Sequence, residues 1–94
     1  MSESIAMADR LRAKLVAALH PSSLTIVDES AHHAGHAGAR EGGETHFRVR
    51  IVSAEFVGLS RVERQRRVYA AVAGEIAAGV HALALTTLTP EEDR

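Results

Sequence analysis

The sequence predicts a single α+β domain in which helices cover a small sheet. Three observations support this fold class. The chain has 94 residues, which suffice for one domain and not for two. An amphipathic helical pattern stands near the N-terminus, and apolar and polar residues alternate strictly along the middle of the chain. We therefore expect one domain over residues 1–94.

The first predicted element is a helix from Ser4 to Leu19, followed by a short strand. The apolar residues of the helix recur at helical spacing: Ile5, Ala8, Leu11, Leu15, Ala18 and Leu19. His20-Pro21 ends the helix, because proline disfavours the helical conformation of the residue before it. Leu24 to Asp28 is rich in β-branched residues, which favour a strand.

The clearest strand runs from Thr45 to Val52. Apolar residues alternate with polar or basic ones, so the sequence predicts one face against the helices and one polar, basic face. The two sets are Phe47, Val49 and Ile51, and His46, Arg48 and Arg50.

A second helical segment begins after Gly58-Leu59. Ser60 and Glu63 have the spacing of a capping box, in which each side chain accepts a hydrogen bond from a free N–H group. We expect the segment to end near Gly79 and extended chain to follow from His81 to Leu88. The order is α-β-β-α-β, and the long helical segment can be split in two. One apolar stripe is predicted along it: Val62, Tyr69, Val72, Ala73 and Ile76.

Composition excludes several classes of function. The absence of cysteine removes disulfides, thiol catalysis and any self-contained iron–sulfur site. The net charge of −1 and three aromatic residues do not favour nucleic acid binding by charge or base stacking. No apolar run is long enough to span a membrane, no signal pattern is present, and no catalytic motif fits. We expect a cytoplasmic, non-enzymatic protein that is a monomer by itself.

The stretch from Ser30 to Phe47 holds four of the six histidines and four of the seven glycines. His33 and His36 have a spacing that lets two imidazoles reach one metal ion. The alternative is a solvated loop whose histidines are incidental. Gly35 to Gly38 also matches the GxxG pattern of KH domains, but it lies between two predicted strands rather than between helices.

Basic residues form the other candidate site. Arg61, Arg64, Arg66 and Arg67 gather at the start of the second helical segment, and Arg48 and Arg50 share a strand face. Such a patch can neutralise phosphates, although a solvated surface is the simpler interpretation. A single histidine, His81, stands at the predicted helix-to-strand junction, where it either binds a ligand or is satisfied locally.

Four segments, in this order along the chain, resemble the BolA family: VDES at 27–30, GGETHFRVRIVS at 42–53, FVGLSRVERQRRVY at 56–69, and GVHALALTTLTPEE at 79–92. The similarity covers nearly the whole chain, and the HAGHAG loop resembles bacterial and plastid members. It implies an α-β-β-α-α-β fold of the class II KH type, in which the long helical segment is split.

The resemblance also implies a role in iron–sulfur cluster assembly. BolA proteins partner monothiol glutaredoxins, and the pair shares a [2Fe–2S] cluster with sulfur ligands from the glutaredoxin and glutathione. The histidine ligand of the family corresponds to His81. The second ligand corresponds to His33, with His36 as the alternative. The isolated chain is then expected to hold no cofactor, and imidazole ligands raise the reduction potential of a cluster.

Two alternatives remain. Bacterial BolA proteins are also described as DNA-binding transcription regulators, for which the arginine-rich helix is the matching segment. There Gln65 replaces the histidine that the family usually has, so no role of that histidine carries over. The other alternative is a heterodimer partner that modulates glutaredoxin without binding metal.

Overall fold

The computed structural model describes residues 6–29 and 45–93. The first part holds helix α1 (Met7–Leu19) and strand β1 (Ser23–Asp28). The second part holds strand β2, a short 3-10 helix η2, helices α2 and α3, and strand β3: His46–Val52, Ala54–Phe56, Arg61–Ala71, Ala73–Ala78 and Ala82–Leu88. The α-β-β-α-α-β order is confirmed, and η2 is an addition that the sequence pattern did not predict.

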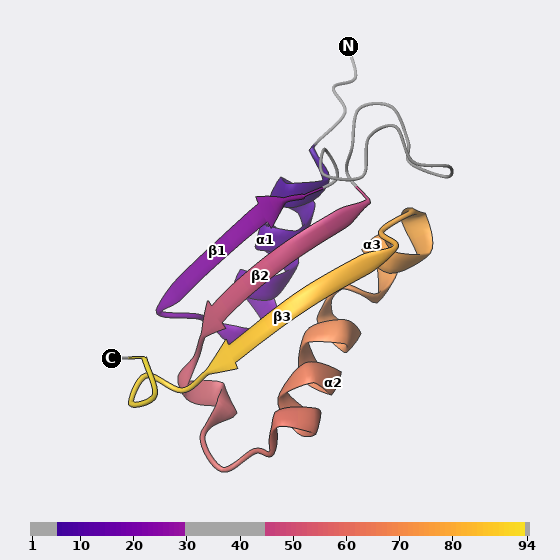
Figure 1. Cartoon of the computed structure of the whole chain (residues 1–94). Coiled ribbons are helices and arrows are strands. Elements are labelled where there is room, and N and C mark those ends of the chain that lie inside the picture. The colour runs from indigo at the N-terminus through magenta and orange to yellow at the C-terminus, as the bar shows by residue number, and fades with distance from the viewer. Residues whose placement is uncertain (1–5, 30–44, 94) are drawn as a thin grey trace.

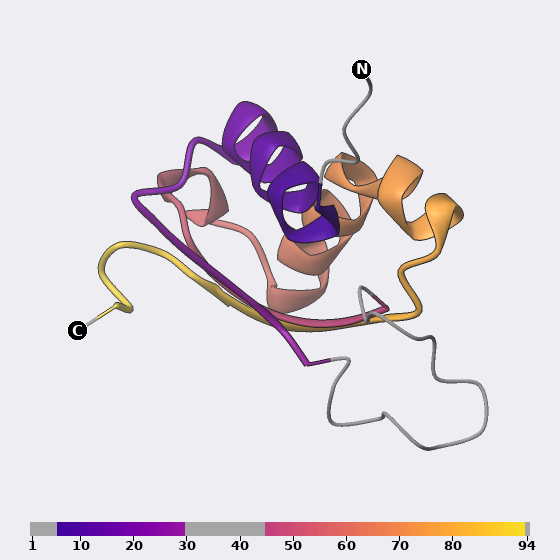
Figure 2. The same ribbon diagram turned by 90° about the horizontal axis from the view of Figure 1, so that it is seen from above.

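The three strands form one sheet in the order β1-β2-β3 (Figure 1). The β1–β2 pair is antiparallel, with Asp28 opposite Phe47, whereas the β2–β3 pair is parallel, with His46 opposite Ala82. Helices α1, α2 and α3 lie on one face of the sheet, and no helix of the described residues lies on the other face (Figure 2). Because the strand order is β1-β2-β3, β3 is an edge strand. Helices α2 and α3 form the crossover connection that parallel pairing of β2 and β3 requires.

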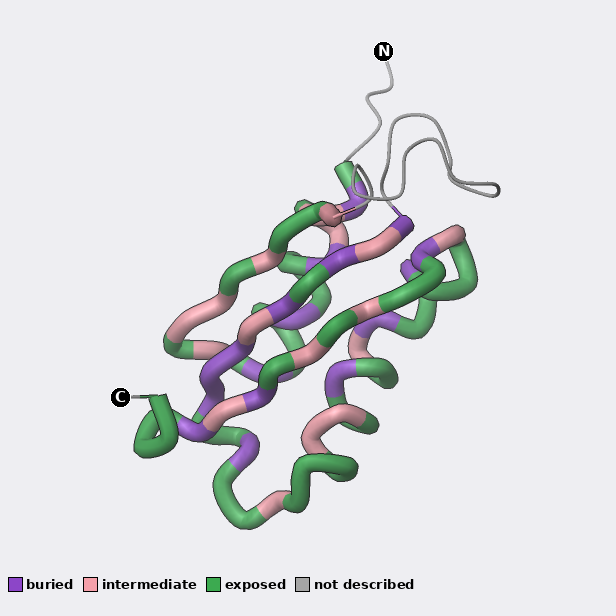
Figure 3. Tube along the Cα trace, in the orientation of Figure 1, coloured by how far each residue is buried: buried purple, intermediate pink, exposed green. Residues whose placement is uncertain are grey.

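The core lies between the sheet and the helices. Phe47, Val49 and Ile51 of β2 are buried, which confirms the predicted alternation along this strand (Figure 3). The helices, η2 and the α3–β3 junction contribute the other apolar side chains of the core: Met7, Leu11, Leu15, Leu19, Phe56, Val68, Val72 and Val80. Nearly all of these are aliphatic, as the scarcity of aromatic residues requires.

The predicted start of α1 was wrong. Ala6 has φ −56° and ψ 143°, so it is extended and the helix begins at Met7; Ser4 and Ile5 lie outside the described residues. A strict four-residue spacing from Met7 to Leu19 forms the buried face, while Ala18 is exposed. The predicted stop is confirmed: His20 has φ 46° and its N–H donates to the Val16 carbonyl.

The predicted apolar stripe along the second helical segment was also wrong. Val72, with φ −113° and ψ 22°, ends α2 and begins α3, so no single helical row passes through both. Of the predicted members only Val72 is buried, and the other buried apolar side chain of the segment is Val68, which the stripe did not include. The remaining predicted members are exposed: Val62, Tyr69, Ala73 and Ile76. The capping box of Ser60 and Glu63 is present as predicted.

Arg64 fastens the start of α2 to the end of β3. Its Nε donates to the Leu59 carbonyl at 3.1 Å, and its Nη1 donates to the Thr87 carbonyl at 3.1 Å. The same guanidinium binds Glu92 in the C-terminal turn, with Nη1 to Oε1 at 2.7 Å. The Arg64 side chain is only 13% exposed. It therefore serves the fold, because two backbone carbonyls depend on it.

The Arg64–Glu92 contact predicts a pH dependence of stability. The bonds from Arg64 and from the Thr89 N–H lower the pKa of Glu92 from 4.5 to about 2. A carboxyl group whose pKa is lower in the folded than in the unfolded protein stabilises the folded state at pH values above the unfolded-state pKa. This contribution is lost as the pH falls from 4.5 toward 2. We expect Glu92→Gln and Arg64→Met to flatten the dependence of unfolding free energy on pH in this range, measured by urea titrations. Arg61→Met, on the same helix and without an ion pair among the described residues, is the control and should leave the slope intact; an equal loss in that variant would contradict the assignment.

Candidate functional site

His81 lies at the junction of α3 and β3, where the backbone is held from several sides. Gly79, with φ 137°, ends α3, and the Val80 N–H donates to the Glu75 carbonyl at 3.2 Å. The N–H groups of His81 and Ala82 both donate to the Thr45 carbonyl, at 2.8 and 3.2 Å. The His81 side chain is exposed. The position thus combines a fixed backbone with an accessible imidazole.

His46 lies beside His81 because parallel pairing places it opposite Ala82. The two imidazole rings are stacked, with centroids 6.1 Å apart and planes at 10°. The Oγ1 of Thr45 bonds to Nδ1 of His46 at 2.8 Å. Thr45 therefore restrains both histidines, one through its hydroxyl group and the other through its carbonyl group.

Glu75, in helix α3 just before the α3–β3 junction, pairs with two cations of helix α1. Its side chain is 2% exposed, and its Oε2 lies 3.3 Å from Nη2 of Arg10 and 3.7 Å from Nζ of Lys14 in α1. Its Oε1 is buried without a hydrogen-bond partner among the described residues. A buried carboxylate requires compensation by paired charges, so these contacts tie the short helix α3 to α1.

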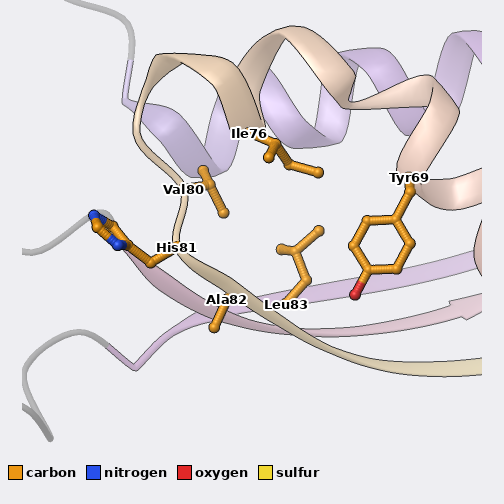
Figure 4. Close-up of a pocket in the computed structure, with 6 residues that line it drawn as sticks. All are labelled: Tyr69, Ile76, Val80, His81, Ala82 and Leu83. Atoms are coloured by element: carbon orange, nitrogen blue, oxygen red, sulfur yellow. The ribbon is translucent and has the colours of Figure 1, made fainter.

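A groove of about 300 Å³ adjoins His81, and we call it the apolar groove because most of the side chains that line it are apolar. It is lined by Tyr69, Ile76, Val80, His81, Ala82 and Leu83. Figure 4 shows the side chains of Tyr69, Ile76 and Leu83 converging, while the His81 ring points away from them at the start of β3. Tyr69 and Ile76 are 42% and 37% exposed. Exposed apolar surface is typical of a protein interaction site, and here it lies beside His81, a potential metal ligand.

The two predicted loop ligands, His33 and His36, lie outside the described residues. The described residues that flank them are Glu29 and Thr45, and the Glu29 N–H donates to the His46 carbonyl at 2.8 Å. Both flanking residues therefore lie at the end of the sheet where His81 directly precedes β3. The topology thus attaches the histidine-rich segment at the end that carries His81.

The described donor set fits a shared metal centre better than a resident one. Within residues 6–29 and 45–93, no group of three or more His, Asp or Glu side chains is placed to hold a metal ion. The chain has no cysteine. Imidazole suits iron, but the tetrahedral sites of a [2Fe–2S] cluster also need thiolates. A cluster at His81 therefore requires sulfur ligands from another molecule.

Four of the six candidate phosphate-binding arginines already contact carboxylates. Their pairs are Arg48–Glu29, Arg50–Asp93, Arg64–Glu92 and Arg67–Glu55. The hydrogen bond to Glu29 is the main cause that raises the pKa of Arg48. Arg61 and Arg66 form no ion pair with any residue that the structure describes. The predicted patch is thus largely neutralised within the fold.

Sequence reasoning missed three features of this site. The His46–His81 stack depends on the β2–β3 register, which no local pattern reveals. No sequence pattern indicated that Glu75 is buried. Its cationic partners, Arg10 and Lys14, lie on a different helix and far from it in the sequence. The exposure of Tyr69 and Ile76 follows from the break at Val72, which the periodicity did not show.

Fold and site together define a thiol-free α+β domain that presents a fixed histidine beside an apolar groove. Comparison with known proteins identifies its family. Residues 15–92 match the family of BolA-like proteins, and the chain belongs to that family.

Three similar proteins represent the range of relatives. An uncharacterized protein in the cobS 5′ region of Sinorhizobium sp is 42% identical over 94% of this chain and 96% of its own length. SufE-like protein 1, chloroplastic/mitochondrial, of Arabidopsis thaliana is 45% identical over 88% of this chain and 24% of its length. The structure of BolA1 from Arabidopsis thaliana is 44% identical, covers 100% of both chains and has a TM-score of 0.84.

These comparisons confirm the resemblance and the α+β fold. This chain spans nearly all of the bacterial relative but only a quarter of SufE-like protein 1. In the described part of the chain, no helix has the length and apolar character needed to cross a bilayer. A cytoplasmic location remains a prediction, because one relative is named as chloroplastic and mitochondrial.

The Glu75 contacts predict an asymmetric response to mutation. Among the described residues, Arg10→Met leaves the buried carboxylate with Lys14 as its one nearby cation, and we expect the free energy of unfolding to fall by about 1–3 kcal/mol. Glu75→Met should cost less, because it removes a desolvated charge and leaves behind only exposed cations. Urea denaturation measures both. Arg12→Met, also on α1, is the control; a larger loss for Glu75→Met than for Arg10→Met would contradict the interpretation.

Proposed function

We propose that this BolA-family protein acts with a monothiol glutaredoxin in [2Fe–2S] cluster binding, trafficking or iron regulation. His81 supplies one ligand to a cluster shared with the glutaredoxin and glutathione, and His33 or His36 supplies a second. The role is that of a partner protein and not of an enzyme. A family relative named SufE-like protein 1 is consistent with a function related to iron–sulfur chemistry.

The observation that carries the proposal is the state of His81. Its backbone is fixed by the Thr45 carbonyl, its ring is stacked on His46, and its side chain is exposed next to an apolar groove. A ligand restrained before binding loses less conformational entropy when a partner arrives. The groove offers that partner an apolar surface to bury at the same place.

Each residue has a separate part in this proposal. The bound cluster would supply electron-transfer chemistry, with a reduction potential raised by neutral imidazole ligands. His81 provides the imidazole, and His46 limits the rotation of its ring by stacking. Thr45 holds the His46 ring through Nδ1 and the His81 backbone through its carbonyl. Tyr69 and Ile76 contribute apolar contact area that excludes water from the interface.

DNA binding remains the alternative, but the described contacts do not favour it. Phosphate contact by Arg48, Arg50 or Arg67 first requires an internal ion pair to break. Arg64 also holds the Leu59 and Thr87 carbonyls, so its release would disturb the fold. Arg61 and Arg66 alone neutralise few phosphates, and affinity for DNA depends on the number of such contacts.

The proposal predicts a spectral change that depends on His81. The protein is titrated anaerobically into cluster-loaded monothiol glutaredoxin with glutathione, and visible absorption and circular dichroism are recorded. We expect the spectrum to change with the wild-type chain, and His81→Ala to abolish that change. Of His33→Ala and His36→Ala, one should lose the change and thereby identify the loop ligand.

His20→Ala is the matched control. His20 is also exposed, but it lies at the C-terminus of α1, at the opposite end of the sheet from His81. The spectral change should survive in this variant. Complex formation without any spectral change would instead support a heterodimer that binds no metal. An unaltered response in His81→Ala would show that this residue is not a ligand.

A further inference from the structure

The apolar groove beside His81 continues along edge strand β3. A second depression of about 280 Å³ is lined by Arg61 and Gln65 of α2 and by residues Leu85 to Leu88 of β3. It adjoins the first, because Leu85 follows Leu83 on the strand and Gln65 lies one turn before Tyr69 on the helix. In Figure 1, α2 lies beyond β3 on the side away from β2, so helix and strand edge form the two walls.

The helix wall changes in character along its length. Arg61, Gln65 and Tyr69 are spaced by four residues and therefore form one row on α2. The row runs from a cation through an amide to an aromatic ring. Arg61 has no ion-pair partner within the described part of the chain, whereas Arg64 and Arg67 on the same helix each have one. The groove thus has a cationic end and an apolar end.

The strand wall offers unpaired backbone groups. The Ala82 N–H donates to Thr45 and the Leu88 carbonyl accepts from Ser53, so the even-numbered residues of β3 point their backbone groups at β2. Because backbone direction alternates along a parallel ladder, the N–H and C=O groups of Leu83, Leu85 and Thr87 point outward. Arg64 binds the Thr87 carbonyl and ends the open edge there. Among the described residues, none bonds to the outward groups of Leu83 and Leu85.

We propose that this groove binds an extended peptide, which adds to β3 as a further strand. An acidic side chain of the peptide pairs with Arg61, and an apolar side chain fills the depression between Tyr69, Ile76 and Leu83. Backbone hydrogen bonds to Leu83 and Leu85 supply affinity, and the two ends of the groove supply specificity. Gln65, between the two ends, has an amide group that can bond to a polar side chain.

Strand geometry fixes the spacing of the peptide's two anchors. Leu83 and Thr87 are about 13 Å apart at about 3.3 Å per residue, and residues two apart face the same side. The acidic and apolar residues therefore stand four positions apart. Antiparallel addition is slightly more stable per residue than parallel addition. Because Arg61 lies by the end of β3, the acidic residue comes first in the peptide and the apolar residue fifth.

A second copy of this chain fits the edge less well than a single strand does. Antiparallel pairing of two β3 strands would bring two α2 helices together on one side of the joined sheet. Packed helices need about 8–10 Å between their axes, whereas paired strands lie about 4.8 Å apart. A single extended peptide can pair with β3 without this conflict, because it brings no second helix to the joined sheet.

The test uses the full, metal-free chain and a fluorescein-labelled, amidated peptide of Glu, Val, Thr, Val and Leu in that order. Fluorescence anisotropy should show saturable binding. Arg61→Glu should weaken it by about tenfold, and a peptide with Lys in the first position should restore binding to that variant. Arg66→Glu, on the same helix but outside the groove, should change affinity less than about twofold.

Methylation of peptide nitrogens tests strand addition directly. The first, third and fifth peptide residues lie opposite Thr87, Leu85 and Leu83, so the third N–H donates to β3 and the second does not. N-methylation of the third residue should abolish binding, and methylation of the second should be tolerated. Thermal unfolding of each protein variant verifies that it is folded.

Several results would overturn this proposal. These are no saturable binding, equal losses in Arg61→Glu and Arg66→Glu, or tolerance of methylation at the third residue. A dimer in sedimentation that the peptide does not dissociate would assign the edge to a second copy. The peptide occupies the apolar groove that the cluster proposal gives to the glutaredoxin surface. Because the assay contains neither iron nor thiol nor glutaredoxin, the two proposals are nevertheless tested separately.

Discussion

Parallel pairing of β2 with β3 is the constraint on which the rest of this structure depends. Two parallel strands need a long crossover, and here α2 and α3 provide it on one face of the sheet. The same pairing brings the start of β3 to the start of β2, which places His81 next to His46. It also leaves β3 at the edge, with α2 beside it. One topological choice therefore creates both the fixed histidine and the adjoining groove.

Two polar residues in the interior convert this arrangement into a rigid site. Thr45 is 3% exposed and bonds to the backbone of His81 and the ring of His46. Glu75 accepts the Val80 N–H through its carbonyl and faces Arg10 and Lys14 through its carboxylate. Both are buried polar groups, which are costly unless paired. Their positions indicate that the α3–β3 junction is restrained from the sheet on one side and from α1 on the other.

Local patterns in the sequence predicted the elements well and their packing less well. The alternation along β2 identified Phe47, Val49 and Ile51 as core residues, because a strand with one buried face has a two-residue period. The stripe across the second helical segment failed because Val72 interrupts the helix, and helical periodicity assumes an unbroken axis. Strand register and long-range contacts, such as that between Arg10 and Glu75, leave no periodic signal. His81 itself was predicted through family resemblance and not through its chemistry.

The difference between His20 and His81 shows why residue type alone could not identify the site. Both are exposed histidines that directly follow or closely follow a helix end. His20 has a positive φ, a 73% exposed side chain and one 3.6 Å approach of its Nδ1 to Oε2 of Glu55. His81 instead directly precedes strand β3, bonds to Thr45 through its N–H and stacks on a second imidazole. Restraint lowers the entropy lost on binding, and only His81 combines restraint with an adjacent apolar surface. The ability to bind a partner therefore depends on the α3–β3 junction, which restrains the imidazole ring of His81. The histidine itself provides the ligand atom at that position.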